Sequence, residues 1–437
     1  MTERLDELIK TVEPRIIEYR RDLHKHAESG WCEYRTASIV AHRLTDLGFD
    51  VKLGRDVVDE KSRTGLPAAE VMKSRYDRAL AEGAVKEFAE KVKDGFTGVV
   101  AELSNGKGPT IGFRFDMDAL EMEEKFSEEH LPHAEGFASI HKEAMHSCGH
   151  DGHTSMGLGL AEVLMGMRDE IRGRVKLIFQ PAEEGARGAK AMVEAGVLDD
   201  VDILFGMHIG FKAVRTGEFV CGTYGFLATS KFDAYYSGRP AHAGSNPQDG
   251  RNALLSAATA VLNLNAIPRH GDGSTRINVG EFTAGGGRNV IPEDAHLVIE
   301  TRGENSALDT YMKTAAVKIL KAAADMYDTE CRIVEMGSGA SADSDDGLVG
   351  RVYEVAKRQD MFPELRAEKV YFGGSEDFTH MMSRVTAKGG KATYLLLGSH
   401  LKGGHHTTRF DFDESILING VKILALLALD LGRNGES

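Results

Sequence analysis

Short runs of apolar residues recur along the chain, and longer stretches with the periodicity of amphipathic helices separate them. Such alternation is typical of α/β folds, in which a largely parallel sheet carries helices on its faces. The sequence therefore predicts an α/β fold with a mostly parallel sheet. Its strands are expected at residues 97–103, 110–115, 175–179, 203–207 and 393–397.

The pattern changes between about residues 226 and 335. Segments there alternate polar and apolar residues, as strands with one solvated face do, and two Ala-rich segments have helical periodicity. The alternating segments are 230–236, 277–283 and 296–302, and the helical ones are 252–265 and 307–326. A smaller α+β domain is therefore predicted at 226–335, inserted into a larger domain of residues 1–225 and 336–437.

Residues 54–95 differ from their surroundings. They are charged, rich in Lys, Glu and Ala, and favour helix, with a break at residues 65–67. We interpret them as a helical insertion in the larger domain. The simpler interpretation is a solvated surface helix with no further role.

The net charge of the chain argues against a nucleic-acid partner. The chain has 53 Lys and Arg against 67 Asp and Glu, a net charge of −14, whereas a nucleic-acid partner needs a basic surface. The N-terminus carries charges throughout and no long apolar run occurs, so neither a signal peptide nor a membrane helix is expected. The four cysteines are widely spaced and form no disulfide framework, so the sequence predicts a cytoplasmic protein with free thiols.

Acids and histidines follow four of the predicted strands, at the point where each strand ends. They are Asp116 and Asp118, Glu183 and Glu184, His208, and finally His400, His405 and His406. The carboxyl ends of parallel strands line one crevice, where ligands of α/β proteins bind. Core packing does not explain such a set, so we expect a functional site at this edge.

Cysteine, histidine and a carboxylate also stand close together in residues 146–154. Zinc and manganese bind such groups, and two ions about 3.5–4 Å apart need a ligand that both share. Cys148, which has small neighbours, is a candidate for the shared ligand. Asp116 and Asp118 are candidates for carboxylates that orient imidazoles.

Metal-assisted hydrolysis also needs a base and groups that stabilise an oxyanion. Of Glu183 and Glu184, one side chain would bind metal and the other would act as the general base. His242 and Asn289, in loops rich in Gly and Pro, are suitable hydrogen-bond donors to an oxyanion. Arg302 would bind a substrate carboxylate bidentately; the alternative is an ordinary surface residue of a strand.

Several motifs occur in the order typical of one family, over nearly the whole chain. They are residues 20–24 with Glu28 and Glu33, 116–120, 146–154, 180–185, His208, 241–243, 287–292, 374–378, and His406 with Phe410. By these motifs the chain resembles the co-catalytic metallopeptidases of the aminoacylase and carboxypeptidase-G type, and within them the amidohydrolases of N-acyl amino acids. The resemblance implies a catalytic domain, a smaller lid or dimerisation domain, and hydrolysis of a linear amide.

Carried over residue by residue, the resemblance implies a site for two divalent ions, Mn²⁺ or Zn²⁺. The ligands would be Cys148, shared by both ions, with Glu184 and His406 for one ion and His150 and His208 for the other. The choice of His406 over His405 depends on its spacing to Phe410. Glu183 would be the general base. His242 would reach into the active site of a partner subunit, where Asn289 would bind substrate or oxyanion.

Ala27, Glu121 and the insertion at 54–95 depart from the usual pattern of the subfamily. With residues 28–31, they are similar to the members that split p-aminobenzoyl-glutamate into p-aminobenzoate and glutamate and that work with a second, homologous subunit. The resemblance thus implies this substrate, and a homodimer or a hetero-oligomer. A general N-acyl amino acid deacylase or a dipeptidase is the alternative. A non-catalytic subunit or a metal-storage protein is disfavoured, because the base and the oxyanion donors are present.

Overall fold

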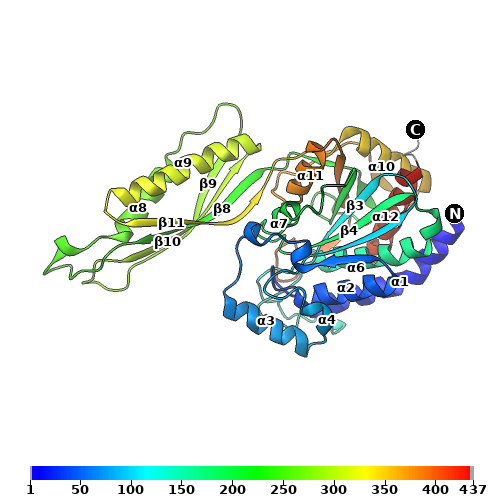
Figure 1. Cartoon of the computed structure of the whole chain (residues 1–437), viewed down its shortest axis with the longest axis horizontal. Helices are drawn as coiled ribbons and strands as arrows, with labels where there is room; N and C mark the ends of the chain where they lie inside the picture. The colour runs from blue at the N-terminus through cyan, green and yellow to red at the C-terminus, as the bar shows by residue number, and fades with distance from the viewer. Residues whose placement is uncertain (1, 434–437) are drawn as a thin grey trace.

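The computed structural model describes residues 2–433; residue 1 and residues 434–437, which the predicted larger domain includes, lie outside the described residues. Figure 1 shows a large α/β unit, which holds both ends of the chain, and a smaller unit that projects from it. Among the described residues, no helix has the length and apolar character needed to cross a membrane.

The large unit is built on an eight-stranded sheet of the described residues, in the order β1-β2-β4-β3-β5-β14-β6-β12. The strands are β1 (Asp50–Leu53), β2 (Val99–Asn105), β3 (Thr110–Asp116), β4 (Gly173–Gln180), β5 (Ile203–Ile209), β6 (Glu218–Val220), β12 (Glu364–Arg366) and β14 (Lys391–Leu397). The four central strands, β4, β3, β5 and β14, are parallel. The α/β prediction is confirmed, and all five strands expected from the apolar runs are present.

The sheet is more mixed than the sequence suggests, because β2 runs antiparallel to both of its neighbours. Residues 106–109 join β2 to β3, and so short a segment cannot make the crossover that parallel strands require. β6 also runs antiparallel to β14. The antiparallel pairs lie towards the edges of the sheet, so the parallel centre still delivers its carboxyl ends to one side.

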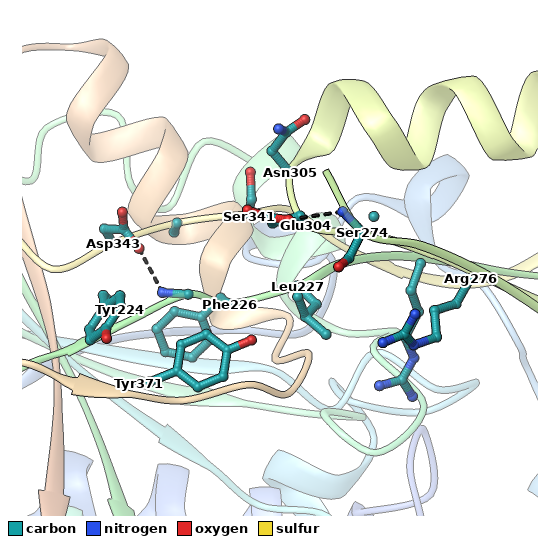
Figure 2. Close-up of a pocket in the computed structure, with 14 residues that line it drawn as sticks. Tyr224, Phe226, Leu227, Ser274, Arg276, Glu304, Asn305, Ser341, Asp343 and Tyr371 are labelled. Carbon is teal, nitrogen blue, oxygen red and sulfur yellow. Dashed lines mark hydrogen bonds between the residues drawn. The ribbon is translucent and has the colours of Figure 1, made fainter. Parts of the chain in front are cut away.

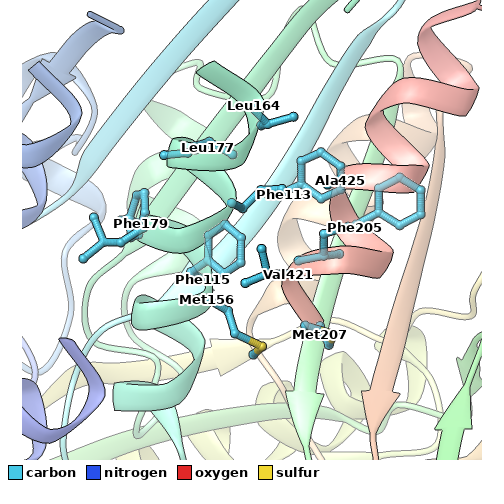
Figure 3. Packing of buried hydrophobic residues seen from close by; sticks show 14 of the residues in the cluster. Phe113, Phe115, Met156, Leu164, Leu177, Phe179, Phe205, Met207, Val421 and Ala425 are labelled. Atoms are coloured by element: carbon cyan, nitrogen blue, oxygen red, sulfur yellow. The ribbon is translucent and has the colours of Figure 1, made fainter. Parts of the chain in front are cut away.

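Helices cover both faces of this sheet. One face packs against α1 (Thr2–Lys25), α2 (Tyr34–Leu47), α6 (His150–Gly166), α10 (Asp346–Gln359) and α12 (Ile416–Arg433), and the other against α7 (Ala189–Glu194) and α11 (Phe378–Ala387). Figure 3 shows Phe113, Phe115 and Phe205 of the sheet against Met156 of α6 and Val421 of α12. This buried apolar contact fixes α6, whose first residue is a predicted metal ligand, against the sheet.

The smaller unit is an antiparallel sheet in the order β11-β8-β10-β9, with two helices on one face. The elements are β8 (Ala228–Ser237), α8 (Ala253–Asn265), β9 (Thr275–Ala284), β10 (Asp294–Gly303), α9 (Ser306–Asp325) and β11 (Glu330–Gly339). Phe232, Leu297 and Met312 lie in its core, which is separate from that of the large unit. The smaller α+β unit expected from the sequence is present. The boundaries 226 and 335 stay a prediction; β11 continues to Gly339.

The insertion packs against the large unit beside α2 (Figure 1). It contains η1 (Gly54–Asp56), η2 (Glu60–Ser62), α3 (Ala69–Ala81) and α4 (Lys86–Ala89). Its central break is tied down, because Trp31 Nε1 donates a hydrogen bond to the Thr64 carbonyl at 2.8 Å. The remaining short elements are α5 (Leu131–Ala134), η3 (Arg168–Glu170), β7 (Thr223–Tyr224), η4 (Pro247–Asp249), β13 (Val370–Tyr371), β15 (Leu401–Lys402) and β16 (Asp411–Phe412).

Candidate active site

Three predicted metal ligands meet where α6 begins beside β5. Gly149 has a φ of +95°, a left-handed conformation that favours glycine, and it turns the chain between Cys148 and His150 into the helix. His208 of β5 brings its Nε2 to 3.4 Å from the Cys148 Sγ. Ligand atoms of Cys148, His150 and His208 all lie within 4.8 Å of one another. This spacing is compatible with one cation between them.

A second group of side chains shares Cys148. Its sulfur, a Glu184 oxygen and a His406 ring nitrogen lie within 4.8 Å of one another, and the His406 Nε2 is 3.3 Å from the Glu184 Oε1. His405 lies differently, with its Nε2 3.0 Å from the Ile209 carbonyl oxygen. The fold therefore gathers the five side chains predicted as ligands, with His406 rather than His405 among them. Their action as ligands stays a prediction.

The chemistry of these groups fits divalent cations. The buried His150 Nε2 and Glu184 Oε1 have no hydrogen-bond partner among the described residues. Buried polar atoms without partners are rare because leaving them unpaired costs free energy, and a bound cation would supply the missing interaction. Thiol, imidazole and carboxylate are groups that bind zinc and, apart from the thiol, manganese.

Backbone carbonyls orient two of the imidazoles. The His150 Nδ1 lies 2.9 Å from the Asp118 carbonyl oxygen, and the His208 Nδ1 lies 2.7 Å from the Ile209 carbonyl oxygen. A carbonyl only accepts, so in both rings the proton belongs on Nδ1. In the neutral form of each ring, which metal binding requires, Nε2 then carries the free lone pair, and Nε2 is the atom that each ring presents to the shared site.

Asp116 and Asp118 support the predicted metal site through different hydrogen bonds. The Asp118 carboxylate accepts hydrogen bonds from the backbone N–H groups of Glu183 and Glu184, both at 3.0 Å. The Asp116 Oδ1 lies 2.6 Å from the Nδ1 of His153, which is not a predicted ligand. From the sequence, these carboxylates are expected to orient ligand imidazoles. In the structure Asp116 is hydrogen-bonded to His153 and also accepts from Arg114 Nη1 at 2.5 Å, whereas the Asp118 Oδ1 lies 3.4 Å from the His150 Nδ1. The orienting role of both carboxylates stays a prediction.

A buried acidic network surrounds Glu183. Oxygens of Glu183, Glu376 and Asp377 lie within 4.8 Å of one another, and Arg114 donates to Glu376 at 3.0 Å and to Asp377 at 3.3 Å. Burial, followed by the charges of Glu376 and Glu184, raises the pKa of Glu183 well above its ordinary value. The sequence motifs predict no role for Arg114, Glu376 or Asp377. The signals available in the sequence were an arginine inside an otherwise apolar strand and the motif at 374–378, which contains Glu376 and Asp377.

Negative charge also affects the thiol and one imidazole. Burial, then Glu184 and Glu183, raise the pKa of the Cys148 thiol well above its ordinary value. Burial opposes protonation of His150, but Asp116 and neighbouring acids outweigh it and raise its pKa to about 10. Acids and a thiol packed this closely repel one another when ionised, and cations would relieve that repulsion.

His242 and Asn289 lie away from these groups. Strand β8 leaves the large unit at Ala228, so the loops that contain these two exposed residues lie at the far end of the smaller unit (Figure 1). The loops are joined by a hydrogen bond from Ala243 N to the Asn289 carbonyl oxygen, at 2.9 Å. Within one chain, the structure does not bring them to the predicted ligands. Their catalytic roles stay a prediction that depends on a partner subunit.

Arg302 lines a cavity of about 540 Å³ between the two units. Figure 2 shows Tyr224 and Tyr371 on one side of this cavity and Arg276 on another. The guanidinium of Arg302 binds Glu300 of the same strand through two hydrogen bonds, at 2.9 and 3.1 Å. A substrate carboxylate would therefore compete with the carboxylate of Glu300 for Arg302. The role of Arg302 in substrate binding stays a prediction.

A second cavity, of about 590 Å³, opens between the units directly beside the predicted metal site. Below, this cavity is called the cleft. The large unit lines it with Ala119, Leu120, Glu121, Glu184, Gly185 and Arg187, and the smaller unit with Lys231, Phe232, Asp233, Asn278, Gly280, Val298, Ile299, Glu300 and Met336. Its mixture of apolar walls and a few charged groups is typical of a small-molecule site.

Known proteins resemble this chain along its whole length. Residues 112–430 match the family model of peptidase family M20/M25/M40. The chain is 47% identical to the indole-3-acetyl-aspartic acid hydrolase of Enterobacter agglomerans and 44% identical to one subunit of the p-aminobenzoyl-glutamate hydrolase of Escherichia coli K12, with 98% of each chain covered in both cases. A crystal structure of an aminobenzoyl-glutamate utilization protein from Klebsiella pneumoniae superposes with a TM-score of 0.84, at 42% identity and 98% coverage of both chains.

Proposed function

The chain belongs to peptidase family M20/M25/M40, and we propose that it is a metal-dependent amidohydrolase that cleaves the amide bond of an N-acyl amino acid. The observation that carries the proposal is the pair of three-residue groups that share Cys148. Cys148, Glu184 and His406 would hold one divalent cation, and Cys148, His150 and His208 the other. Mn²⁺ and Zn²⁺ are the candidates.

Glu183 would move the protons. When bound, two divalent cations supply Lewis acidity, which lowers the pKa of water and polarises a carbonyl oxygen. Glu183 would accept a proton from the attacking water and deliver it to the leaving amine. Asp118 fixes the backbone that carries Glu183 and Glu184.

The substrate class follows from two relatives and from the cleft. The names of the relatives from Enterobacter agglomerans and Escherichia coli describe an aromatic acyl group joined to aspartate or glutamate. The cleft offers apolar side chains for a ring and the cations Arg187 and Lys231 for carboxylates. The substrate we propose is p-aminobenzoyl-glutamate, split into p-aminobenzoate and glutamate.

Turnover by purified protein tests this proposal. Protein stripped with a chelator and refilled with manganese or zinc is expected to release p-aminobenzoate, and the stripped protein to lose nearly all of this activity. Indole-3-acetyl-aspartate, hippurate and a dipeptide serve as comparison substrates. Equal turnover of hippurate or the dipeptide would favour a general deacylase or dipeptidase, and a refilled protein inert towards all four would reject the proposal.

We expect the smaller unit to carry the contact between subunits. Strand β9 pairs only with β10 among the described strands, so its outer edge is free. Leu262 of α8 is 74% exposed, and Leu255 and Phe282 are also exposed. A free strand edge with apolar side chains is a surface that a partner covers. The partner would be a second copy of this chain or a homologous second subunit, and would bring its His242 to the active site.

Mixing two inactive variants tests the cross-subunit role of His242. In a homodimer, Glu183→Gln lacks the base, and His242→Ala lacks the group given to the partner. Co-refolded variants should recover about a quarter of wild-type activity, because random pairing in a two-fold dimer leaves that share of sites intact. Mixed dimers that form, as native mass spectrometry would establish, but stay inactive would exclude this role in a homodimer.

A further inference from the structure

Arg187 is fixed beside the predicted metal site by two backbone carbonyls. Its Nε donates a hydrogen bond to the Glu184 carbonyl at 2.8 Å, and its Nη1 donates to the Gly65 carbonyl at 2.9 Å. The first carbonyl belongs to a predicted metal ligand, and the second belongs to the insertion at 54–95. The half-buried guanidinium is therefore held in one place at the wall of the cleft.

The charge of Arg187 is not neutralised by the protein. Within residues 2–433 no carboxylate forms an ion pair with it, and no group accepts a hydrogen bond from its Nη2. The other cation of the cleft, Lys231, lies 3.8 Å from the carboxylate of Glu300. Arg187 is thus the cleft cation whose charge stays unpaired and whose Nη2 is left to donate to a ligand.

Two segments singled out in the sequence enclose Arg187. A Cβ atom at Gly30 would lie 2.4 Å from its Nη2, and a Cβ at Gly65 would lie 2.6 Å from its Cδ, so both glycines leave room for the side chain. The neighbours of these glycines are joined by the hydrogen bond from Trp31 to Thr64. The insertion therefore forms part of the cradle that positions Arg187, rather than a solvated helix alone.

We propose that Arg187 binds the side-chain carboxylate of an acyl-glutamate or acyl-aspartate, and that the insertion holds Arg187 in position for this contact. The inference rests on the proposed function. The cleft also contains Glu121, Asp233 and Glu300. Their negative charges repel the side-chain carboxylate of such a substrate, so this carboxylate needs an unpaired cation in the cleft. A planar guanidinium with free donors binds a carboxylate through charge-assisted hydrogen bonds.

Binding to a non-hydrolysing variant tests the inference. In manganese-loaded Glu183→Gln protein, calorimetry would compare p-aminobenzoyl-glutamate with p-aminobenzoyl-glutamine, which lacks the side-chain charge. Adding Arg187→Gln is expected to weaken binding of the glutamate ligand by about 10- to 100-fold, as loss of a hydrogen bond between charged groups does. The glutamine ligand should change by less than about threefold. Arg187→Lys keeps the charge but lacks the planar donors. It should also weaken binding of the glutamate ligand selectively, but by a smaller factor.

Lys190→Gln is the matched control, because Lys190 is an exposed cation three residues further along and does not line the cleft. It should leave both affinities unchanged. Equal weakening of both ligands by Arg187→Gln, no weakening of either, or no binding of the glutamate ligand to the parent variant would overturn the inference. Because binding is measured without turnover, the two proposals fail separately. A wild-type protein inert towards p-aminobenzoyl-glutamate, with Arg187-dependent binding retained, would reject the function and keep the inference.

Discussion

Replacing Glu183 by glutamine is expected to lower kcat for p-aminobenzoyl-glutamate by about 10²–10⁴-fold, the usual contribution of general acid–base catalysis. The reason is chemical: a neutral amide cannot take a proton from water, although its size and its hydrogen-bonding oxygen are kept. Since Glu183 would act in both proton transfers, the loss should lie near the upper end of this range. Metal content should stay at the wild-type level, because Glu184, not Glu183, belongs to the group with Cys148 and His406.

Steady-state kinetics and elemental analysis of the same preparations would check this result. Glu194→Gln is a suitable control: Glu194 ends α7, is exposed, and lies near Arg384 on the surface. It should retain wild-type kcat and metal content. Normal turnover by Glu183→Gln would exclude Glu183 as the base. A simultaneous loss of metal would instead identify Glu183 as a metal ligand. Its Oε2 lies 3.9 Å from the His150 Nε2, close enough for both atoms to bind one cation.

Replacing Cys148 by alanine is expected to remove both cations, and with them nearly all activity. Cys148 is common to the two groups of ligands, so each group loses one of its three members. Without the cations, the negative charges of Glu183 and Glu184 would repel each other with less positive charge nearby. Elemental analysis should find the content falling from about two ions per chain towards none, because affinity falls steeply when a ligand is lost. The variant should also lose the thermal stabilisation that added metal gives the wild type.

Cys221→Ala provides the matched control for the loss of a thiol. Cys221 is buried in the core of the large unit, away from the predicted ligands. Its replacement should cost about 1 kcal/mol of unfolding free energy for the small cavity and should leave both ions bound. Wild-type metal occupancy in Cys148→Ala would contradict the shared-ligand assignment, whatever its activity.

The buried acids around Glu183 carry more negative charge than the nearby cations neutralise. Arg114 pairs with Asp116, Glu376 and Asp377, yet carboxylates still outnumber cations around Glu183. An excess of buried negative charge is unfavourable in the protein alone and becomes favourable around divalent cations. We therefore expect folding stability and metal binding to be strongly linked in this protein.

Local patterns in the sequence were sufficient for the strands, the smaller α+β unit and the gathering of chemical groups at one edge of the sheet. Apolar runs such as 110–115 and 203–207 specify buried strands through side-chain periodicity alone. Where consecutive strands are parallel, the residues that follow them must meet, so Asp118, Glu184 and His208 could be expected near one another. Cys148 and its neighbours could be added because ligand-type residues are dense there.

The tertiary structure decided what depends on contacts between distant segments. The pairing of Arg114 with Glu376, 262 positions apart, requires the packing that brings the segment before α11 to the end of β3. The direction of β2 follows from a short connection, and the separation of His405 from His406 follows from a backbone turn at His406, where φ is +60°. The unpaired state of Arg187 beside the insertion, and the pairing of Arg302 with Glu300, are likewise properties of packing. Hydrophobic periodicity is a property of neighbours along the chain, whereas charge compensation depends on which neighbours folding brings together.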